Sequence, residues 1–278
     1  MEKPLVSICI PAYNSARYIE KTVRAALKSD WPNLEVLVVD DGSEDETVPV
    51  LRRLASEDGR LRVLVNETNL GMTGNWNKCV KEARGEYVKL IPADDLVYPD
   101  CLKKTLPPLL KDPEVRLSIC GTDLINEEGR VTGSYAHWPA AGVHDGAKVA
   151  KASLLFNNFF GNPVCALFRK ADFERVGGFD EEIVYILDFD LWLKLASLGK
   201  VAFRKEKLSG FLVRNDSNTG RMIGSGRRIY TAEHRRLVEK YREGGAFSLN
   251  GAEAAFSVFW RAARNWIILG YMKILARR

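Results

Sequence analysis

Two pairs of adjacent aspartates carry the most informative chemistry in this sequence. Asp40-Asp41 follows the apolar run 34–39, and Asp94-Asp95 follows a second apolar run that ends at Ile91. Adjacent carboxylates repel each other, so such a pair is costly unless a hydrogen-bond donor or a cation relieves the repulsion. At strand ends, carboxylates can bind a nucleotide or a hard divalent cation. The alternative for Asp40 and Asp41 is a simple turn, because Asp, Gly and Ser are common turn residues.

The first half of the chain alternates short apolar runs with amphipathic stretches. This alternation predicts an α/β fold with a mostly parallel central sheet, flanking helices and right-handed crossovers. In such an open sheet, ligands bind outside the carboxyl ends of the strands, so we expect the two acidic pairs to share one site. The predicted strands are 6–10, 34–39, 61–65 and 87–91, and the predicted helices are 16–28, 44–56, 74–83 and 99–110.

The alternation weakens beyond about residue 113. The patterns there predict strands over 116–122 and 164–169, helices over 170–176 and 188–197, and a loop from 126 to 146 that is rich in Gly, Pro and polar residues. If the second half of the chain contributes carboxylates to the same site as the two acidic pairs, Asp188 and Asp190 are the candidates.

Composition restricts the class of protein. The chain has 278 residues, 46% of them hydrophobic and 28% charged, as in a soluble globular protein. The five cysteines are scattered without metal-type spacing, so we expect neither a disulfide framework nor a zinc site, and a reducing cytoplasm fits. The sequence starts without the basic and apolar regions of a signal peptide, which predicts a cytoplasmic protein.

Positive charge is concentrated at the C-terminal end of the chain. Residues 201–278 hold 16 Lys and Arg against 6 Asp and Glu, whereas the whole chain has a net charge of +5. Residues 254–278 combine this charge with Phe and Trp, and three basic residues interrupt the apolar stretch too often for a comfortable membrane span. A basic aromatic helix can lie in the interface of an anionic membrane, and this favours a membrane partner over nucleic acid. The alternative is a terminal helix that packs on the domain, with Ser257, Arg261 and Arg264 on one face together with Asn265.

Several motifs occur together in the order found in a known family. They are Val6-Ser7-Ile8-Cys9-Ile10-Pro11-Ala12-Tyr13-Asn14, Val39-Asp40-Asp41-Gly42-Ser43, the segment from Gly85 to Asp95, Gly177-Gly178-Phe179-Asp180, and the segment from Asp188 to Ala196. In order and spacing, residues 4–200 resemble family 2 of the inverting glycosyltransferases. The resemblance implies a GT-A fold, a nucleoside-diphosphate sugar as donor, and a divalent cation, Mg²⁺ or Mn²⁺, as cofactor.

The resemblance also implies roles for individual residues. Asp41 would contact the nucleotide base, most often uracil in this family, and Asp95 would bind the cation. Asp188 would be the general base that takes the proton from an acceptor hydroxyl, which is a poor nucleophile without such help. The remaining residues expected beside the nucleotide sugar are Pro11, Tyr13, Asn14, Asn69, Gly71 and Asp94.

Two positions depart from the family pattern. Many relatives carry an Asp-x-Asp triplet that ends at the position of Asp94, and its first residue here is Pro92. Many also carry a histidine after the catalytic helix, where this chain has Arg214, which could supply positive charge to the diphosphate instead. Alternatives stay open for the catalytic helix itself. Asp188 could simply cap it, Asp190 could be a first-turn acid that favours the helix dipole, and Trp192 could pack in the core or contact sugar.

The sequence thus predicts a glycosyltransferase domain over residues 1–215, with a nucleotide-binding half to about 112 and an acceptor-side half from 113. A basic helical extension would follow over 216–278. The expected activity is metal-dependent, inverting transfer of a sugar, with a UDP-sugar favoured, to a glycan or lipid-linked acceptor in cell-surface polysaccharide synthesis. Two alternatives are a nucleotide-sugar-binding module without turnover and a sugar-phosphate nucleotidyltransferase. The latter typically has a Gly-rich loop with Arg and Lys after its first strand, where this chain has Pro11-Ala12-Tyr13-Asn14.

Overall fold

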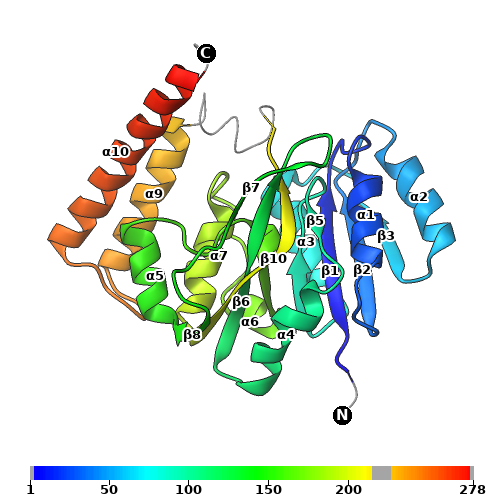
Figure 1. Cartoon of the computed structure of the whole chain (residues 1–278), viewed down its shortest axis with the longest axis horizontal. Coiled ribbons are helices and arrows are strands. Elements are labelled where there is room, and N and C mark those ends of the chain that lie inside the picture. Colours follow the sequence, from blue (N-terminus) through cyan, green and yellow to red (C-terminus); the bar gives the residue numbers. More distant parts are fainter. Residues whose placement is uncertain (1–2, 215–226, 276–278) are drawn as a thin grey trace.

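The computed structural model describes residues 3–214 and 227–275, with side chains to residue 264. A single twisted sheet runs through its centre, helices cover both faces, and two C-terminal helices lie at one end of the molecule (Figure 1). The predicted α/β class with a central sheet, flanking helices and C-terminal helical segment is confirmed.

The first half of the chain forms a parallel sheet. Its strands lie in the order β3-β2-β1-β4, and β1 and β2 are buried along their whole length because helices cover both faces. The elements are β1 (Val6–Ala12), α1 (Ile19–Leu27), β2 (Leu34–Asp40), α2 (Thr47–Glu57), β3 (Leu61–Val65), α3 (Gly71–Glu82) and β4 (Tyr87–Leu90). This order puts the carboxyl ends of β1, β2 and β4 side by side, as the sequence pattern predicts.

The second half continues the same sheet with mixed pairing. The order runs on as β4-β9-β6-β10-β5, with β6 and β10 parallel, and β4-β9, β6-β9 and β5-β10 antiparallel. The elements are β5 (Leu96–Val97), α4 (Cys101–Lys111), β6 (Val115–Ile125), β7 (Val131–Tyr135), β8 (Gly142–Asp145), α5 (Gly146–Leu155), the 3₁₀ turn η1 (Pro163–Cys165), β9 (Ala166–Arg169), α6 (Lys170–Arg175), α7 (Leu187–Ala196) and β10 (Lys200–Leu212).

Several of these elements were not predicted. The expected loop over 126–146 contains β7 and β8, two edge strands whose side chains are mostly exposed, so backbone pairing rather than an apolar pattern defines them. Strand β10 escapes a pattern search because the charged residues 204–207 interrupt it, where its register with β6 shifts. Helix α5 follows β8 directly, inside a region that the sequence left without structure.

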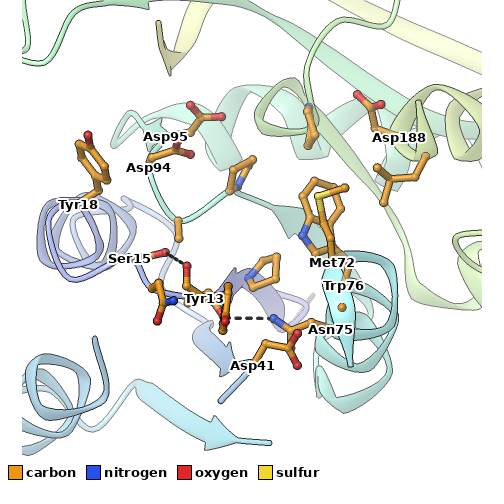
Figure 2. Close-up of a pocket in the computed structure, with 18 of the residues that line it drawn as sticks. Tyr13, Ser15, Tyr18, Asp41, Met72, Asn75, Trp76, Asp94, Asp95 and Asp188 are labelled. Carbon is orange, nitrogen blue, oxygen red and sulfur yellow. Dashed lines mark hydrogen bonds between the residues drawn. The ribbon is translucent and has the colours of Figure 1, made fainter. Parts of the chain in front are cut away.

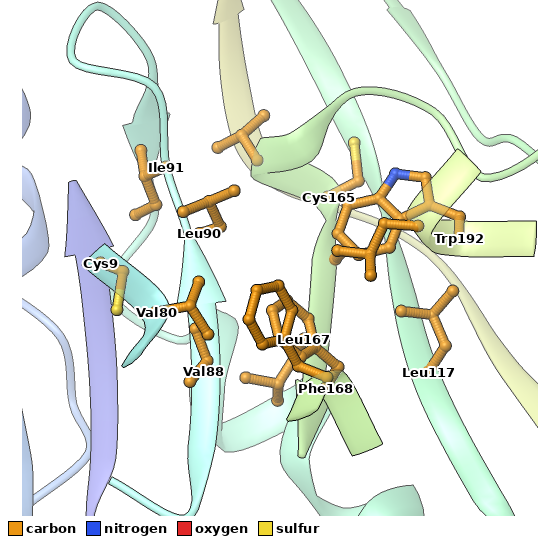
Figure 3. Close-up of a cluster of buried hydrophobic side chains, with 14 of the residues drawn as sticks. Cys9, Val80, Val88, Leu90, Ile91, Leu117, Cys165, Leu167, Phe168 and Trp192 are labelled. Carbon is orange, nitrogen blue, oxygen red and sulfur yellow. The ribbon is translucent and has the colours of Figure 1, made fainter. Parts of the chain in front are cut away.

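The core lies between the sheet and its covering helices. Figure 3 shows side chains of β4, β6 and β9 packing with Val80 of α3 and Trp192 of α7. Trp192 is fully buried, with its ring 5.8 Å from that of Phe168. Of the two interpretations of Trp192, packing is therefore correct, because the side chain cannot meet a ligand from inside the core.

The two C-terminal helices, α9 (Arg227–Arg242) and α10 (Gly251–Leu275), lie alongside each other (Figure 1). Two polar residues of α10, Ser257 and Arg261, face the protein, and the side chain of Asn265 lies outside the described residues. Ser257 is fully buried, donates to the backbone oxygen of Leu154 in α5 and contacts His234 of α9, and Arg261 is buried as well. The aromatic side chains Phe256 and Phe259 are exposed instead. None of the helices in the described part of the chain combines the length and the apolar character needed to cross a membrane.

Candidate active site

One pocket of about 760 Å³ opens at the carboxyl ends of the central strands. Its volume is that of a typical small-molecule site. All nine residues predicted for the site line it: Pro11, Tyr13, Asn14, Asp41, Asn69, Gly71, Asp94, Asp95 and Asp188. Figure 2 shows Asp41, the Asp94-Asp95 pair and Asp188 in three separate corners around this space.

The chain leaves β1 through a turn that a specific hydrogen-bond network fixes. Asn14 has the left-handed backbone conformation (φ 46°), which Asn tolerates better than most residues. Its backbone N–H donates to Ser43 Oγ at 2.8 Å, and its side-chain oxygen accepts from the N–H of Glu44 at 2.9 Å. This turn leaves Tyr13 half exposed at the pocket wall, where an aromatic ring can stack on a base or sugar.

The first acidic pair divides into a structural and a ligand-facing residue. Asp40 is fully buried and accepts two hydrogen bonds from Ser43, so the turn interpretation is correct for this residue. Asp41 lines the pocket, and its Oδ1 accepts from Asn66 Nδ2 at 2.7 Å and from the N–H of Leu70 at 2.8 Å. These two bonds to Oδ1 fix the orientation of the carboxylate. Among the described residues, no hydrogen bond is made to Oδ2, so this oxygen is available to a ligand.

Helix α3 begins beside Asp41 and brings together the predicted residues Asn69 and Gly71 with Asn75, which the sequence patterns did not reveal. Asn69, just before the helix, donates to the backbone oxygen of Asp41 at 3.0 Å, and Gly71 has φ +73° with open space at its Cβ position. Asn75 donates to the backbone oxygens of Ala12 and Val39, so it fastens β1, β2 and α3 together beneath the pocket. A signal existed, because Asn is unusual in the interior of a helix unless its side chain has a partner.

The second acidic pair lies between β4 and β5. Arg214 donates from Nε and Nη2 to Asp94 Oδ2 at 3.0 and 2.9 Å, and its guanidinium lies 4.9 Å from the ring of Tyr18. Asp95 is almost fully buried, and its Oδ1 accepts from the N–H of Leu212 at 2.9 Å. Burial, and then the charge of Asp94, raises the pKa of Asp95 well above its usual range. Arg214 therefore occupies a place beside the acidic pair, and Tyr18 completes that wall of the pocket.

These residues fit a divalent cation bound together with its substrate. Asp95 Oδ2 is buried and has no hydrogen-bond partner, which leaves one carboxylate oxygen available for a ligand. The described residues contain no cluster of three or more His, Cys, Asp or Glu side chains that could hold a metal ion. Mg²⁺ commonly takes one or two carboxylates from the protein and the rest of its ligands from phosphate oxygens and water. A site that is complete only with a diphosphate present matches that chemistry.

Asp188 enters the pocket from the first turn of α7. Its side chain is half buried, and burial raises its pKa to about 7, although the backbone N–H groups of Phe189 and of Asp188 itself partly oppose the shift. A carboxylate with a pKa near 7 can take up a proton at neutral pH far better than an ordinary aspartate can. Asp190, two residues on, is fully buried and faces Lys194 and Lys240 instead of the pocket.

The motif Gly177-Gly178-Phe179 joins the two halves of the protein next to the site. Asn77 of α3 donates to the backbone oxygen of Phe179 at 3.0 Å and accepts from its N–H at 2.9 Å. A Cβ atom on Gly178 would lie 2.7 Å from Asn77 Oδ1, so only glycine permits this approach. The link holds α3, which lines one side of the pocket, to the segment that leads into α7.

Comparisons with known proteins agree with this geometry. A sequence model described as Glycosyl transferase family 2 matches residues 7–177. Chondroitin synthase of Escherichia coli is 31% identical over 70% of this chain and 27% of its own length, and hyaluronan synthase of Pasteurella multocida is 28% identical over 80% and 22%. An uncharacterized protein of Mycobacterium tuberculosis is 28% identical over 96% of this chain and 84% of its own length. This chain thus spans less than a third of either synthase.

Two solved structures share the fold. Residues 1–349 of S. aureus TarS in complex with UDP-GlcNAc match with a TM-score of 0.68 and 20% identity, over 91% of this chain and 70% of that chain. The mannosyltransferase PcManGT from Pyrobaculum calidifontis, in complex with GDP-Man and Mn²⁺, matches with a TM-score of 0.65 and 20% identity, over 100% and 82%. The fold and the pocket define a sugar-nucleotide transferase of the GT-A class. The chain belongs to glycosyl transferase family 2, and it is a glycosyltransferase.

Proposed function

We propose that this protein transfers a sugar, with inversion at the anomeric carbon, from a nucleoside-diphosphate sugar to a hydroxyl group of a glycan or lipid-linked acceptor. The observation that carries the proposal is the convergence of Asp41, the Asp94-Asp95 pair and Asp188 on one pocket (Figure 2). They supply a nucleotide contact, a cation or diphosphate contact and a general base at three separate points, as the reaction requires.

Asp41 is the proposed nucleobase contact. Its Oδ1 is held by Asn66 and Leu70, which leaves Oδ2 to accept an N–H from the base. A uracil has such an N–H, so we favour a UDP-sugar as donor. The TarS structure with UDP-GlcNAc supports this choice, because a chain of the same fold is seen with that class of donor.

Asp94, Asp95 and Arg214 form the proposed diphosphate end of the site. A divalent cation bound here would neutralise the negative charge that develops on the leaving diphosphate. Asp95 Oδ2 is the protein oxygen available to it, with Asp94 beside the sugar or ribose. Arg214, which binds Asp94 in this structure, carries a fixed positive charge that can contact the same phosphates. The Mn²⁺ in the PcManGT structure supports the choice of cation.

Asp188 is the proposed general base. It lies on the side of the pocket formed by Val184, Tyr185 and Leu187, away from the nucleotide contacts of β1 and β2. An acceptor hydroxyl placed there loses its proton to Asp188 as its oxygen attacks the anomeric carbon from the face opposite the diphosphate. That direction of attack inverts the configuration.

We also propose that the protein works at the surface of an anionic membrane, on the cytoplasmic side. The side chains of Phe156, Phe256, Phe259 and Trp260 form an exposed patch, the aromatic patch, where α10 meets α5. Exposed aromatic residues on an otherwise basic segment are the composition of interfacial helices. A lipid-linked acceptor in cell-surface polysaccharide synthesis would be found at such a surface.

The test of the activity measures which product is released from UDP-, GDP- and dTDP-sugars, with Mn²⁺ or with EDTA. The native chain is compared with Asp188→Asn, Asp95→Ala and the control Asp58→Asn, which lies in an exposed turn paired with Arg60. We expect nucleoside diphosphate from one donor, dependent on Mn²⁺ and lost in the first two variants only. Formation of nucleoside triphosphate and sugar phosphate after addition of pyrophosphate would instead indicate a nucleotidyltransferase. Donor binding by calorimetry without any release, across a panel of acceptors, would indicate a binding module.

The membrane proposal has a separate test. Sedimentation with phosphatidylcholine vesicles that contain phosphatidylglycerol measures binding of the native chain, of Phe259→Ser and of the control Leu110→Ser. Both residues are exposed apolar side chains, but Leu110 lies on α4, outside the aromatic patch. Burial of one Phe side chain contributes roughly 1.5–3 kcal/mol, so Phe259→Ser should bind about tenfold more weakly or worse. Equal binding of all three proteins would contradict the proposal.

A further inference from the structure

The start of α7, which carries Asp188, is held by a residue from the far end of the chain. Glu233 of α9 accepts the backbone N–H of Val184 on Oε1 at 2.8 Å and those of Tyr185 and Ile186 on Oε2 at 3.0 and 3.2 Å. The first N–H groups of a helix and of the turn before it have no partner within the helix. No side chain of α7 itself caps this end. A buried carboxylate from 47 residues or more further along the chain satisfies three such groups at once.

A second contact joins α9 to α7 on the other side of Asp188. Lys240 Nζ lies 3.0 Å from Oδ1 of Asp190, and Lys194 of α7 pairs with the same carboxylate. Glu233 and Lys240 are two helical turns apart, so they lie on one face of α9. Leu237 and Val238, which lie between them in the sequence, are buried. Two charged side chains on one face of α9 therefore join this helix to α7 and to the turn before it.

Asp188 lies between the two contact points. Residues 184–186 are fixed by Glu233, and Asp190 is fixed by Lys240, which leaves Asp188 at the centre of the restrained turn. Val184 and Tyr185 also line the pocket, so Glu233 positions the part of the pocket wall where the acceptor is proposed to bind. The partly buried carboxylate of Asp188 would gain solvation if its turn moved toward water, and the contacts of Glu233 and Lys240 oppose that movement.

We propose that Glu233 and Lys240 are positioning residues for the general base, and that α9 is therefore part of the catalytic unit. The proposal rests on the proposed function, in which Asp188 is the base. It assigns a role in the reaction to a segment that follows the residues matched by the family model, 7–177, and also the predicted transferase domain, 1–215. Neither residue contacts substrate in this arrangement. Both act through α7.

The test compares Glu233→Gln with Glu239→Gln. Both variants remove one negative charge from α9, but Glu239 is exposed and pairs only with Arg242 among the described residues. Gln keeps the shape of Glu and loses one of the two accepting oxygens, so at least one N–H of residues 184–186 loses its partner. Hydrogen exchange of a peptide over 183–192 should become about tenfold faster or more in Glu233→Gln and stay unchanged in Glu239→Gln.

The kinetic measurement uses the donor and acceptor that give turnover in the native chain. Because a displacement of about 1 Å costs on the order of 100-fold in rate, we expect kcat to fall about 10- to 100-fold in Glu233→Gln. The donor KM should change less than about twofold, since Asp41 and the Asp94-Asp95 pair are unaltered. Lys240→Gln should show the same split with a smaller loss. If Glu233→Gln fails to fold, Lys240→Gln takes its place in the comparison with Glu239→Gln.

The outcomes separate the two proposals. If kcat or the exchange rate of peptide 183–192 is the same in Glu233→Gln as in Glu239→Gln, the positioning role is wrong. Equal losses in kcat and in donor binding would also overturn it, because they indicate general damage to the fold. If the native chain shows no turnover with any donor, the proposed function has failed, while the exchange measurement still reports whether Glu233 holds the turn.

Discussion

Replacing Asp188 with Asn should make the protein inactive and, at alkaline pH, more stable. Burial raises the pKa of Asp188 to about 7 in the folded protein, whereas an aspartate in an unfolded chain titrates near ~3.9. Between these values the folded state binds the proton and the unfolded state does not. The free energy of unfolding therefore decreases as the pH rises toward 7 and is constant above it. Asn cannot ionise, so the variant does not incur this cost.

The magnitude follows from the distance between the two pKa values. At about 1.4 kcal/mol per pKa unit, the titration of Asp188 lowers the free energy of unfolding, relative to strongly acidic pH, by at most about 4 kcal/mol at pH 8 and about 2 kcal/mol at pH 5.5. The stability advantage of Asp188→Asn should thus grow by about 2 kcal/mol between these pH values. In a protein of this size, that corresponds to about 4–8 °C in Tm. Turnover should fall about 10²- to 10⁴-fold, the usual contribution of a general base.

Thermal unfolding at pH 5.5 and pH 8, together with the pH dependence of turnover, provides the assay. Turnover of the native chain should rise about fivefold from pH 6 to pH 7 and about twofold more above pH 7 before it levels off, because only the deprotonated carboxylate accepts a proton. Asp58→Asn is the control, since its pairing with Arg60 lowers the pKa of Asp58 and places its titration below the tested range. A stability difference between Asp188→Asn and the native chain that is the same at both pH values would refute the reasoning.

Further predictions follow from single contacts. Gly178→Ala should lower the free energy of unfolding by about 2–4 kcal/mol, because its Cβ would lie 2.7 Å from Asn77 Oδ1. Gly177→Ala has a similar φ but open space, and urea unfolding should show a loss of only about 1 kcal/mol. Asp41→Asn should weaken UDP binding about 10- to 100-fold in calorimetry, the loss expected for one hydrogen bond to a charged group. Trp192→Ala should cost about 3–5 kcal/mol in stability while the UDP affinity of the folded protein stays the same.

The placement of Asp41, Asp94 and Asp95 at one pocket could be predicted from the sequence because each of them follows a strong local pattern. The strands before Asp41 and Asp94 are continuous apolar runs, and a parallel sheet brings the ends of such strands to one edge. Asn75 could not be assigned in the same way, and Arg214 was noticed only because it stands where many relatives of the family carry a histidine. The side chain of Asn75 donates to backbone oxygens of β1 and β2, and that of Arg214 donates to the Asp94 carboxylate, and no local pattern encodes these partners.

The C-terminal helices show the opposite case, in which a pattern was visible but ambiguous. The polar face of α10 at Ser257 and Arg261 could meet water or protein, since periodicity identifies a face without naming its neighbour. In the structure it faces α5 and α9, and the aromatic residues are exposed. Glu233 was indistinguishable from other charged residues of a basic segment, because its function depends on backbone groups almost 50 residues away.

The chemistry proposed for Asp188 and the restraint proposed for Glu233 depend on each other physically. A carboxylate is a good base at neutral pH only if it is partly removed from water, and that removal destabilises the ionised form. A short helix turn with such a group relaxes toward solvent unless both of its sides are fixed. Asp188 has no ion pair among the described residues, and the contacts that lower its pKa are backbone N–H groups of its own turn, which move with it. The hydrogen bonds of Glu233 and the ion pair of Lys240 fix the chain on either side without neutralising the base. A cation placed directly against Asp188 would hold it equally well, but it would lower the pKa and so reduce the basicity that the reaction needs.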